Sequence, residues 1–361
     1  MGARLIAVSG LGPKEPAAFV LETNSQRLLL DCGEGPEPGR LPDVDAIGRI
    51  DAIILSHGHN DHAGALRLRD RIGSPPVYAT APVITRLPAG IAAQPIPIRG
   101  RANVRDIAIE TGPNGHAPGG VWLRLAVGEG ILYMGDYSIE SALYGFDQPP
   151  PTATMIFDAS YGDAEETQTR QRADLADMAE NAALLLPVPA DGRGPEIAMF
   201  LQQAGFDVAI DAQVRAAAIL LTQAARTSAK PAGVPALEQL IRTARPLDAD
   251  TPGRGVMVAH GGSGDTGVAA ALIRRWREDS DPAIVFTGHL AAGTAGRQLV
   301  DNGRARFRRW NVHPTFSQNL RLIESVNPRR VVPAFGDTRF YPLWRHSLAP
   351  RQVITSPVVE L

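Results

Sequence analysis

The sequence predicts an α/β protein built of two parts, one rich in strands and one in which strands and helices alternate. Three observations support this prediction. In the first third of the 361 residues, short apolar runs alternate with turn residues. After Asp158, longer helical segments separate short strands, a pattern typical of a second α/β domain. Near Arg304 the pattern becomes strand-like again.

The strand-rich part begins near the N-terminus and has few long helices. Its expected strands are short apolar runs bounded by Gly, Pro or Asn: Leu5–Val8, Ala18–Glu22, Arg27–Leu30, Asp51–Leu55, Val77–Ala79, Ile107–Ile109, Val121–Ala126 and Ile131–Met134. A helix-like stretch covers Ala63–Arg71. The run Pro149–Pro151 precedes the change of pattern and marks a boundary only loosely.

The second part has the longer helices, and the strand-like end of the chain follows it. The expected helices are Glu165–Leu186, Glu196–Ala204, Val214–Ala225 and Val268–Arg277. Val256–Ala259 and Ala283–Thr287 are expected strands that flank the last of these helices. The final segment predicts a strand over Phe307–Val312, a helix over Ser317–Val326 and a strand over Arg330–Ala334.

The composition is that of an ordinary globular protein, with 44% hydrophobic and 20% charged residues. The net charge of -2 indicates no global positive field, so a nucleic-acid partner would have to meet a local patch. The single cysteine, Cys32, excludes an intrachain disulfide and a cysteine-rich zinc site. No signal-peptide core or membrane span is recognisable, so we expect a cytoplasmic protein with no membrane partner.

The stretch SHGHNDHAG, Ser56–Gly64, contains three of the eight histidines of the chain. Zinc needs several nitrogen and carboxylate donors that converge on one point. His57 and His59 point to the same side of an extended segment, since side chains alternate along a strand. Asp61 and His62 follow a turn later and can face a neighbouring point. The cluster therefore predicts two adjacent metal sites, although a chance cluster of core histidines is the alternative.

Two metals need further ligands, and the sequence offers candidates at other strand ends. His116 lies in a glycine-rich loop just before the strand expected at Val121. Asp136 follows the next strand, in the stretch Gly135-Asp136. Asp31 ends the strand at Leu30 and alone could be a simple turn or cap residue.

Together these motifs resemble the metallo-β-lactamase fold. The resemblance rests on Asp31-Cys32-Gly33, the H-x-H-x-D-H cluster, Gly115-His116 and Gly135-Asp136. It implies an αββα sandwich with metals at one edge of two packed sheets. It also implies the following ligands: His57, His59 and His116 for one zinc, Asp61 and His62 for the other, and Asp136 bridging both. Asp31 would orient the cluster loop without binding metal.

The second part resembles the β-CASP nucleases, a branch of that superfamily. The similarity covers most of the chain and rests on Phe157–Asp163, Leu186–Glu196, Thr287–Arg297 and Asn311–Thr315, in order. It implies a metallo-β-lactamase domain over 1–161 and 308–361, with an α/β β-CASP domain inserted at 162–307. It further implies hydrolysis of phosphodiester bonds in RNA or DNA by a metal-activated hydroxide. Asp61 and Asp136 would be catalytic as metal ligands.

Within this resemblance, Asp158 would support the metal site. His313 would contact the scissile phosphate or protonate the leaving oxygen. A surface loop histidine is the alternative for His313.

One departure concerns the last metal ligand. In RNA-processing members a histidine completes the second zinc site, and here Phe335 occupies that position. We expect one or two Zn²⁺ ions, with the second held more weakly and Mn²⁺ able to replace it. DNA-type members also lack this histidine, so the departure leans modestly towards DNA or towards a single tightly bound metal. His289 could substitute for the missing ligand, but it is a weak candidate.

Other stretches offer candidate substrate contacts. Arg193 lies in a matched motif and is the best single candidate for a phosphate contact. The loop His260–Gly267, with Ser263, has a G-x-G-x-x-G pattern and could present backbone N–H groups to a phosphate; a plain strand–helix turn is equally expected. The basic stretch Arg304–Trp310 could line a phosphate track or form a strand with Phe307 or Trp310 in the core.

The sequence therefore predicts a zinc-dependent β-CASP nuclease that acts on RNA or single-stranded DNA. One alternative is another hydrolase of the same fold that acts on a small ester or thioester. The other is a non-catalytic nucleic-acid-binding subunit of a larger complex. Association into a homo-oligomer or a protein complex is left open.

Overall fold

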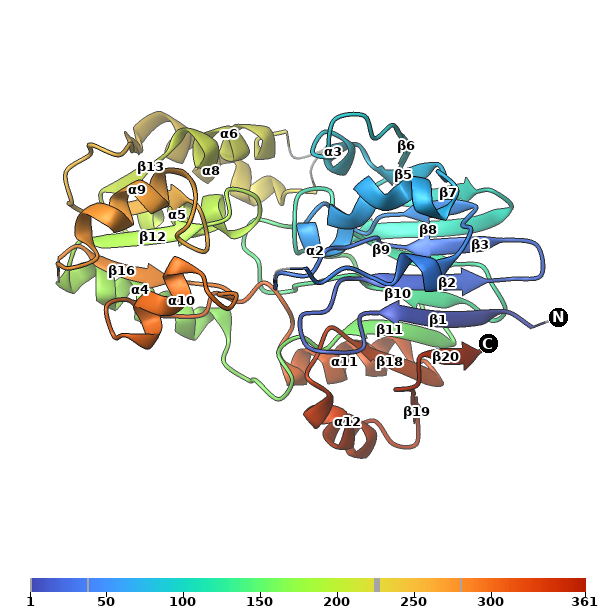
Figure 1. The fold of residues 1–361 in the computed structure, drawn as a ribbon. Coiled ribbons are helices and arrows are strands. Elements are labelled where there is room, and N and C mark those ends of the chain that lie inside the picture. Colours follow the sequence, from blue (N-terminus) through green and yellow to red (C-terminus); the bar gives the residue numbers. More distant parts are fainter. Residues whose placement is uncertain (1, 38, 224–227, 280) are drawn as a thin grey trace. The chain divides into compact units, whose positions relative to one another are not determined.

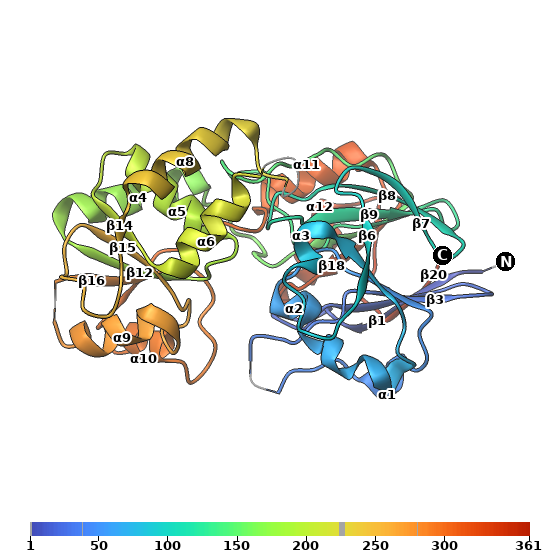
Figure 2. The ribbon, with the colours of Figure 1, turned by 90° about the horizontal axis from the view of Figure 1, so that it is seen from above.

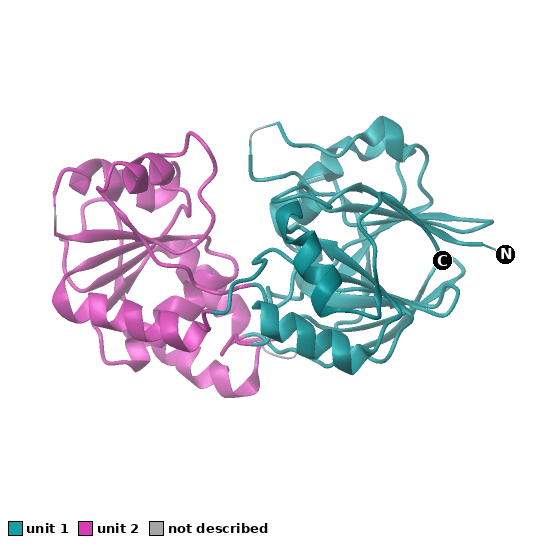
Figure 3. Ribbon diagram, turned by 90° about the horizontal axis from the view of Figure 1, so that it is seen from below, with its two compact units in different colours: residues 1–139, 144–165, 313–361 teal, residues 140–143, 166–312 magenta. Residues whose placement is uncertain are grey.

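The structure, a computed structural model, describes residues 2–37, 39–223, 228–279 and 281–361. The chain forms two compact units (Figure 3). Unit 1 contains residues 1–139, 144–165 and 313–361, and unit 2 contains residues 140–143 and 166–312. The domain junctions expected from the sequence were 161/162 and 307/308, whereas the corresponding unit borders are 165/166 and 312/313.

Unit 1 contains two seven-stranded sheets. The first has the order β20-β1-β2-β3-β4-β5-β6. Its strands are β20 (Val358–Glu360), β1 (Arg4–Ser9), β2 (Ala18–Glu22), β3 (Arg27–Leu30), β4 (Ala52–Ile54), β5 (Val77–Thr80) and β6 (Ala93–Ile96). The strands β3, β4 and β5 are parallel, so their carboxyl ends lie at one edge of the sheet.

The second sheet has the order β19-β18-β11-β10-β9-β8-β7. Its strands are β19 (Gln352–Val353), β18 (Arg330–Ala334), β11 (Thr154–Asp158), β10 (Ile131–Tyr133), β9 (Val121–Leu125), β8 (Ile107–Pro113) and β7 (Gly100–Val104). The strands β10, β11 and β18 are parallel. Asp136, Asp158 and Phe335 therefore lie at or just after neighbouring strand ends.

The two sheets pack face to face, and helices cover their outer faces (Figures 1 and 2). Phe19 and Leu30 of the first sheet meet Leu123 and Tyr133 of the second in the central core. The short helices α1 (Val44–Ile47), α2 (Asn60–Ala63) and α3 (Ala81–Ile84) cover the first sheet, and α11 (Phe316–Val326) and α12 (Tyr341–Ser347) cover the second. This arrangement confirms the expected αββα sandwich.

Unit 2 is a parallel six-stranded sheet with helices on both faces. Its order is β14-β13-β15-β12-β16-β17. The strands are β14 (Arg245–Pro246), β13 (Val208–Ile210), β15 (Val256–His260), β12 (Leu184–Val188), β16 (Ala283–Phe286) and β17 (Arg306–Phe307). The helices are α4 (Gln168–Asn181), α5 (Arg193–Gln203), α6 (Ala212–Leu221), α8 (Val234–Thr243), α9 (Gly267–Trp276) and α10 (Ala295–Asp301). Figure 2 shows α9 and α10 on one face of this sheet.

A buried carboxylate fixes two segments near the border of unit 2. Glu196 on α5 is only 2% exposed. It accepts hydrogen bonds from Ser141 Oγ (2.9 Å), from the Ala142 backbone N–H (2.6 Å) and from Trp310 Nε1 (3.3 Å). Arg172 lies 3.6 Å away and completes the charge pair. Glu196, the last residue of the Leu186–Glu196 motif, thus has its hydrogen-bond partners within unit 2.

Several expected elements differ from those observed. The helix expected over Glu165–Leu186 ends at Asn181, and Leu184–Val188 is the buried central strand β12 instead. The stretch Ala63–Arg71 is mainly a 3-10 helix, Gly64–Ile72. Strand pairing at the end of unit 2 covers only Arg306–Phe307. The end expected for the helix Val214–Ala225 lies outside the described residues. No helix within the described ranges is long and apolar enough to cross a bilayer.

Candidate metal centre

The histidine cluster lies where β4 ends and α2 begins. His57 lies in the intervening loop, His59 precedes the first residue of α2, and His62 lies within that helix. Gly33, after β3, allows the two loops to meet, because a Cβ there would lie 1.7 Å from the Asp61 carbonyl oxygen. The short helix and this tight contact between the two loops together fix the positions of Asp61 and His62.

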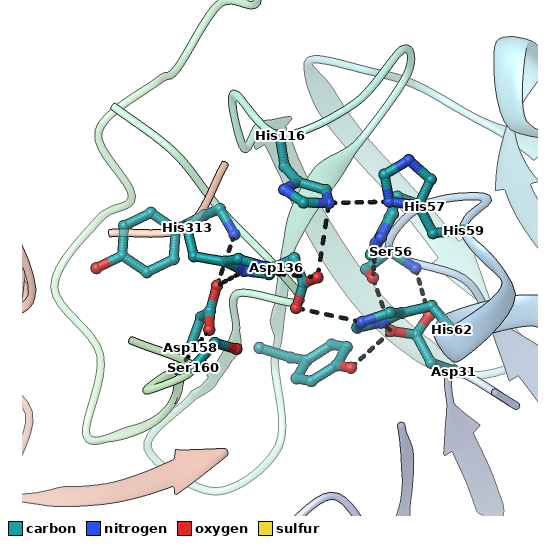
Figure 4. Close-up of polar contacts among 12 residues, drawn as sticks. Asp31, Ser56, His57, His59, His62, His116, Asp136, Asp158, Ser160 and His313 are labelled. Carbon is teal, nitrogen blue, oxygen red and sulfur yellow. Dashed lines mark hydrogen bonds and ion pairs between the residues drawn. The ribbon is translucent and has the colours of Figure 1, made fainter. Parts of the chain in front are cut away.

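Asp31 anchors this loop from the end of β3. Its side chain is fully buried, and its backbone has a positive φ of 58°. One carboxylate oxygen accepts from the Ser56 N–H (2.7 Å). The other accepts from Ser56 Oγ (2.7 Å), His62 Nδ1 (2.7 Å) and Tyr133 Oη (2.6 Å). Figure 4 shows Asp31 below the cluster, in contact with His62 and Ser56.

His57, His59 and His116 form a first group of donors whose ligand atoms lie within 4.8 Å of one another. His59 Nδ1 and His116 Nε2 are 2.9 Å apart (Figure 4). Within the described part of the chain, His57 Nε2 and His59 Nε2 are buried without a hydrogen-bond partner. Burial, reinforced by the neighbouring imidazoles, lowers the pKa of His57 and of His59 well below the ordinary value, so both rings are neutral at pH 7. Neutral imidazoles with unpaired buried nitrogens fit a zinc ion.

His116 reaches this group from the loop between β8 and β9. Gly115 has a positive φ of 73°, and a Cβ there would lie 1.9 Å from the Ser138 carbonyl oxygen. The loop can therefore pack against the Asp136 loop only with glycine at this position. Its backbone is closed by the Asn114 N–H, which donates to the Gly120 carbonyl.

Asp61 and His62 form a second group of donors together with His57, and Asp136 forms a third group with His116 and His313. The ligand atoms of Asp61 and His62 lie within 4.8 Å of each other and of His57. Asp136 Oδ1 lies 3.2 Å from His62 Nε2, and its Oδ2 lies 3.5 Å from His116 Nε2. Asp136 therefore faces the first and the second group, which suits a bridging ligand.

The charges of His62 and Asp136 are strongly interdependent. Burial opposes the charged form of His62, but the carboxylates of Asp136 and Asp31 outweigh it and raise the pKa of His62 well above its ordinary value. Burial likewise opposes ionisation of Asp136, but the imidazoles of His62 and His313 hold its pKa well below the ordinary value. In the metal-free protein, a positive His62 thus lies between two carboxylates.

Phe335, directly after β18, contributes no donor to the second group. Its backbone has a positive φ of 64°, and its N–H donates to the Gly10 carbonyl (2.8 Å). Its ring is only 5% exposed and packs edge-on against the His62 ring, 5.1 Å between centroids. Phe19 packs against its other side, at 6.1 Å. The second group is thus bounded by an apolar wall.

A buried histidine–aspartate pair lies on the other side of Asp136 (Figure 4). His313 Nδ1 donates to Asp158 Oδ2 (2.7 Å) and lies 3.7 Å from Asp136 Oδ2. Asp158, at the end of β11, is fully buried, and its Oδ1 accepts from the Ser160 N–H (2.9 Å). The Tyr161 ring packs edge-on against His313 at 5.0 Å. His313 is therefore a buried residue of this site, and the surface-loop alternative is wrong.

Unit 1 brings together most of the candidate residues. They are Asp31, His57, His59, Asp61, His62, His116, Asp136, Asp158 and His313. Arg193 and Ser263 belong to unit 2. There, Arg193 Nε donates to Thr287 Oγ1 (3.0 Å), and the Ser263 carbonyl accepts from the Gly296 N–H (2.8 Å).

The basic stretch before His313 is partly exposed. Phe307 is 38% exposed, whereas Trp310 is 1% exposed and bonded to Glu196. Trp310 is therefore the core residue of this stretch. The loop His260–Gly267 connects β15 with α9, as a strand–turn–helix unit.

Four residues of the centre were not predicted from the sequence: Ser56, Tyr133, Tyr137 and Asn319. Ser56 directly precedes His57, and Tyr133 and Tyr137 flank the Gly135-Asp136 motif, so their proximity along the chain was an available signal. Tyr137 Oη donates to Asn319 Oδ1 (2.7 Å), and Asn319 Nδ2 donates to the Asp158 carbonyl (2.9 Å). Asn319 lies far from these motifs in sequence and gave no signal.

Comparisons with known proteins agree with this geometry. The family model of the metallo-beta-lactamase superfamily matches residues 11–179. Transcription termination factor FttA of Cenarchaeum symbiosum is 26% identical over 250 residues, covering 55% of this chain and 38% of that protein. Endoribonuclease YSH1 of Mycosarcoma maydis is 24% identical over 416 residues, covering 92% of this chain and 47% of that protein. The chain thus spans less than half the length of these two relatives.

One solved structure shares the fold over the whole chain. It is a protein of unknown function from Enterococcus faecalis V583, with a TM-score of 0.60 and 14% identity, and all of both chains is covered. The matched superfamily, the αββα sandwich with its donor groups and the named relatives agree with one another. In sequence and in fold, the chain is similar to the metallo-β-lactamase superfamily and, through the relatives named above, to its β-CASP branch.

Proposed function

We propose that this chain is a zinc-dependent nuclease that hydrolyses the phosphodiester bonds of RNA. One observation carries the proposal: the buried imidazole donors lie on one side of Asp136, and the Asp158–His313 pair lies on its other side. A metal-binding carboxylate next to a proton-carrying pair suits phosphodiester hydrolysis. The relative named as an endoribonuclease supports RNA as the first substrate to test.

His57, His59 and His116 would hold the first zinc ion. Asp61 and His62 would hold a second ion, with Asp136 shared, and Mn²⁺ could replace zinc there because two of the three ligands are carboxylates. Phe335 makes this second site weaker. When bound, such ions polarise a phosphoryl oxygen and lower the pKa of water towards neutrality.

The Asp158–His313 pair would manage the proton of the leaving group. Because Nδ1–H of His313 donates to Asp158, the tautomer and the orientation of the ring are fixed. Nε2 is then the nitrogen that would carry a proton to the leaving oxygen. Such a transfer typically accelerates a reaction about 10²–10⁴-fold. His313→Ala should therefore lower kcat by about that factor.

Arg193 and Ser263 remain candidates for contacts with the substrate phosphates. Arg193 would act through its planar guanidinium, which can bind a phosphate with two parallel hydrogen bonds. Arg193→Ala should raise KM more than it lowers kcat, with a weaker salt dependence of binding. Ser263 would act through its loop backbone, so Ser263→Ala should change little.

The test is cleavage of 5′-labelled single-stranded RNA and DNA of one sequence, with zinc or manganese added. Asp136→Asn controls for a contaminating nuclease. His346→Ala is the matched control for His313→Ala, because His346 lies on α12 and belongs to none of the donor groups. We expect wild type and His346→Ala to cut RNA, and the other two variants to be strongly impaired.

The alternatives give different results in the same assay. Preferential cleavage of DNA would contradict RNA as the substrate and would assign the chain to DNA processing. A zinc-loaded protein that cuts neither polymer but hydrolyses a small ester or thioester would contradict the nuclease proposal. Purification without zinc, together with binding of RNA and no cleavage, would identify a non-catalytic subunit.

A further inference from the structure

Two buried polar residues connect the segments that carry the metal ligand Asp136 and the Asp158–His313 pair. Tyr137 directly follows Asp136 and is 0% exposed, and Asn319 on α11 is 2% exposed. The Tyr137 hydroxyl donates to Asn319 Oδ1 at 2.7 Å, and Asn319 Nδ2 donates to the Asp158 carbonyl at 2.9 Å. One side-chain amide therefore bridges two strand ends of the second sheet.

Tyr137 and Asn319 are linked to the Asp158–His313 pair by two further contacts. The Tyr137 N–H faces Asp158 Oδ2 at 3.4 Å, and that oxygen accepts from His313 Nδ1 at 2.7 Å. The helix that carries Asn319 begins at Phe316, directly after the His313-Pro314-Thr315 segment. Asn319 thus lies between the strand end of Asp158 and the helix that follows His313.

The surroundings of this bridge do not demand polar side chains. Phe157, Leu322 and Ile323 pack with Tyr137 in one buried apolar cluster. A phenol and an amide in such a place are unfavourable unless they are hydrogen-bonded. An apolar pair of similar volume would fill the space without that requirement. The two polar side chains at this buried place therefore point to a role in positioning neighbouring segments and not in packing alone.

We propose that Tyr137 and Asn319 are positioning residues, which hold the Asp158–His313 pair at a fixed place beside Asp136. The inference rests on the proposed nuclease function. The amide fixes the Asp158 strand end, and the tyrosine transmits that position to the loop of Asp136. Neither residue belongs to a donor group in the described part of the chain. The imidazole of His313 would lose its orientation when the bridge is broken.

The variants Tyr137→Phe and Asn319→Leu test this proposal because each removes the bridge and keeps most of the volume. Tyr341→Phe is the matched control, because the Tyr341 hydroxyl donates to the Leu11 carbonyl and does not contact the bridge. Each variant is assayed with RNA and with bis(p-nitrophenyl) phosphate. The second substrate releases p-nitrophenolate, which needs no proton from the protein.

We expect kcat with RNA to fall about tenfold in both bridge variants, equivalent to about 1.4 kcal/mol, with KM within twofold. With the activated ester, kcat should stay within twofold, as it should for His313→Ala. The double variant should be no slower than the slower single variant, since both break one bridge. Zinc content should match that of Tyr341→Phe, whereas the melting temperature should fall by more, because each single variant leaves a buried polar partner without its hydrogen bond. Both rates are therefore measured well below the melting temperature of every variant.

A merely structural role gives a different pattern, because loss of folded or metal-loaded protein lowers both rates equally. Equal losses with the two substrates, or an unchanged rate with RNA, would overturn the proposal. If wild type cuts no polynucleotide, the proposed function fails separately. A crystal structure of Asn319→Leu then decides: a retained 2.7 Å contact between His313 Nδ1 and Asp158 Oδ2 overturns the positioning role, and a displaced His313 ring supports it.

Discussion

Asp31→Asn should destabilise the metal-free protein and weaken the second metal site, whose candidate ligand His62 it holds, without disturbing the backbone. The change keeps the size of the side chain and one of its oxygens. Asparagine adopts positive φ more readily than most residues, so the φ of 58° at this position adds no new strain. The comparison therefore isolates the carboxylate. An alanine variant would combine that loss with backbone strain.

The expected magnitude follows from the hydrogen bonds that the lost oxygen accepts. Asp31 Oδ2 accepts from Ser56 Oγ, His62 Nδ1 and Tyr133 Oη. An amide NH₂ in its place would face three donors. The two hydroxyls can rotate to accept, but the imidazole N–H cannot. Hydrogen bonds to charged groups contribute about 1.5–3 kcal/mol each, so we expect a loss of about 2–4 kcal/mol in the free energy of unfolding.

Urea unfolding of the metal-free protein measures this loss, and competition with a chelator measures the zinc affinity of the second site, which should fall about 10–100-fold. Asp51→Asn is the matched control. Its carboxylate is half-buried and accepts one hydrogen bond, from the Arg27 N–H at 2.8 Å, which an amide oxygen still accepts. The control should change stability by less than about 0.5 kcal/mol. If Asp31→Asn costs no more than the control and keeps its zinc affinity, the reasoning is refuted.

Four further predictions concern the metal sites, the thiol and unit 2. Phe335→His should raise the metal content measured after dialysis from one ion towards two per chain; an unchanged content would show that the second group needs more than this ligand. The pKa of His62 is raised, and a metal ligand must be neutral, so metal binding at the second site should release about one proton. The metal affinity of that site should rise by up to about tenfold per pH unit above neutrality, whereas the affinity of the first site, whose histidines already have low pKa values, should change little. Calorimetry in two buffers measures the proton release and the affinity, and a proton release of zero at the second site would contradict this prediction. Burial and the neighbouring Asp31 charge raise the pKa of the Cys32 thiol to about 12, so iodoacetamide at pH 8 should label it only after unfolding, and rapid labelling of the native protein would contradict its burial. Glu196→Ala should lower the stability of unit 2 by about 3–5 kcal/mol, because it leaves buried donors without an acceptor; an unchanged urea midpoint would contradict this role.

Elements with clear periodicity could be predicted from the sequence almost to the residue. The strands Ala18–Glu22, Arg27–Leu30 and Arg330–Ala334 have the bounds expected from their apolar runs. The edge strands Ala93–Ile96 and Gly100–Val104 were missed because most of their side chains are exposed and carry no alternating pattern. Such strands exist because a neighbouring strand pairs with them, and a single sequence does not contain that information.

The overextended helix after Glu165 has a different cause. A short continuous apolar run fits a buried strand and a buried helix equally well by periodicity alone. Leu184–Leu186 continue a helical pattern in sequence, yet the parallel neighbours Val256–Val258 make them the centre of a sheet. Tertiary pairing decides such cases.

The candidate site was accessible where its residues are close in sequence or belong to a recognisable motif. The cluster from His57 to His62 is contiguous, and the strand-end rule pointed to Asp31 and Asp136. Asn319 could not be found in this way, because an asparagine in the first turn of a helix is common and its partners are distant in sequence. Only the fold brings its amide to the Asp158 carbonyl.

The discontinuity of unit 1 also sets the order in which a newly made chain can complete its centre. The candidate metal ligands from His57 to Asp136 are all synthesised before residue 140, but His313, β18 and β20 come after unit 2. Since β20 pairs with β1 and β18 with β11, both sheets are incomplete until residues 313–361 have left the ribosome. Unit 2 can begin to fold while the sandwich is still open. The nascent chain therefore contains the candidate metal ligands well before His313 can join them in one site.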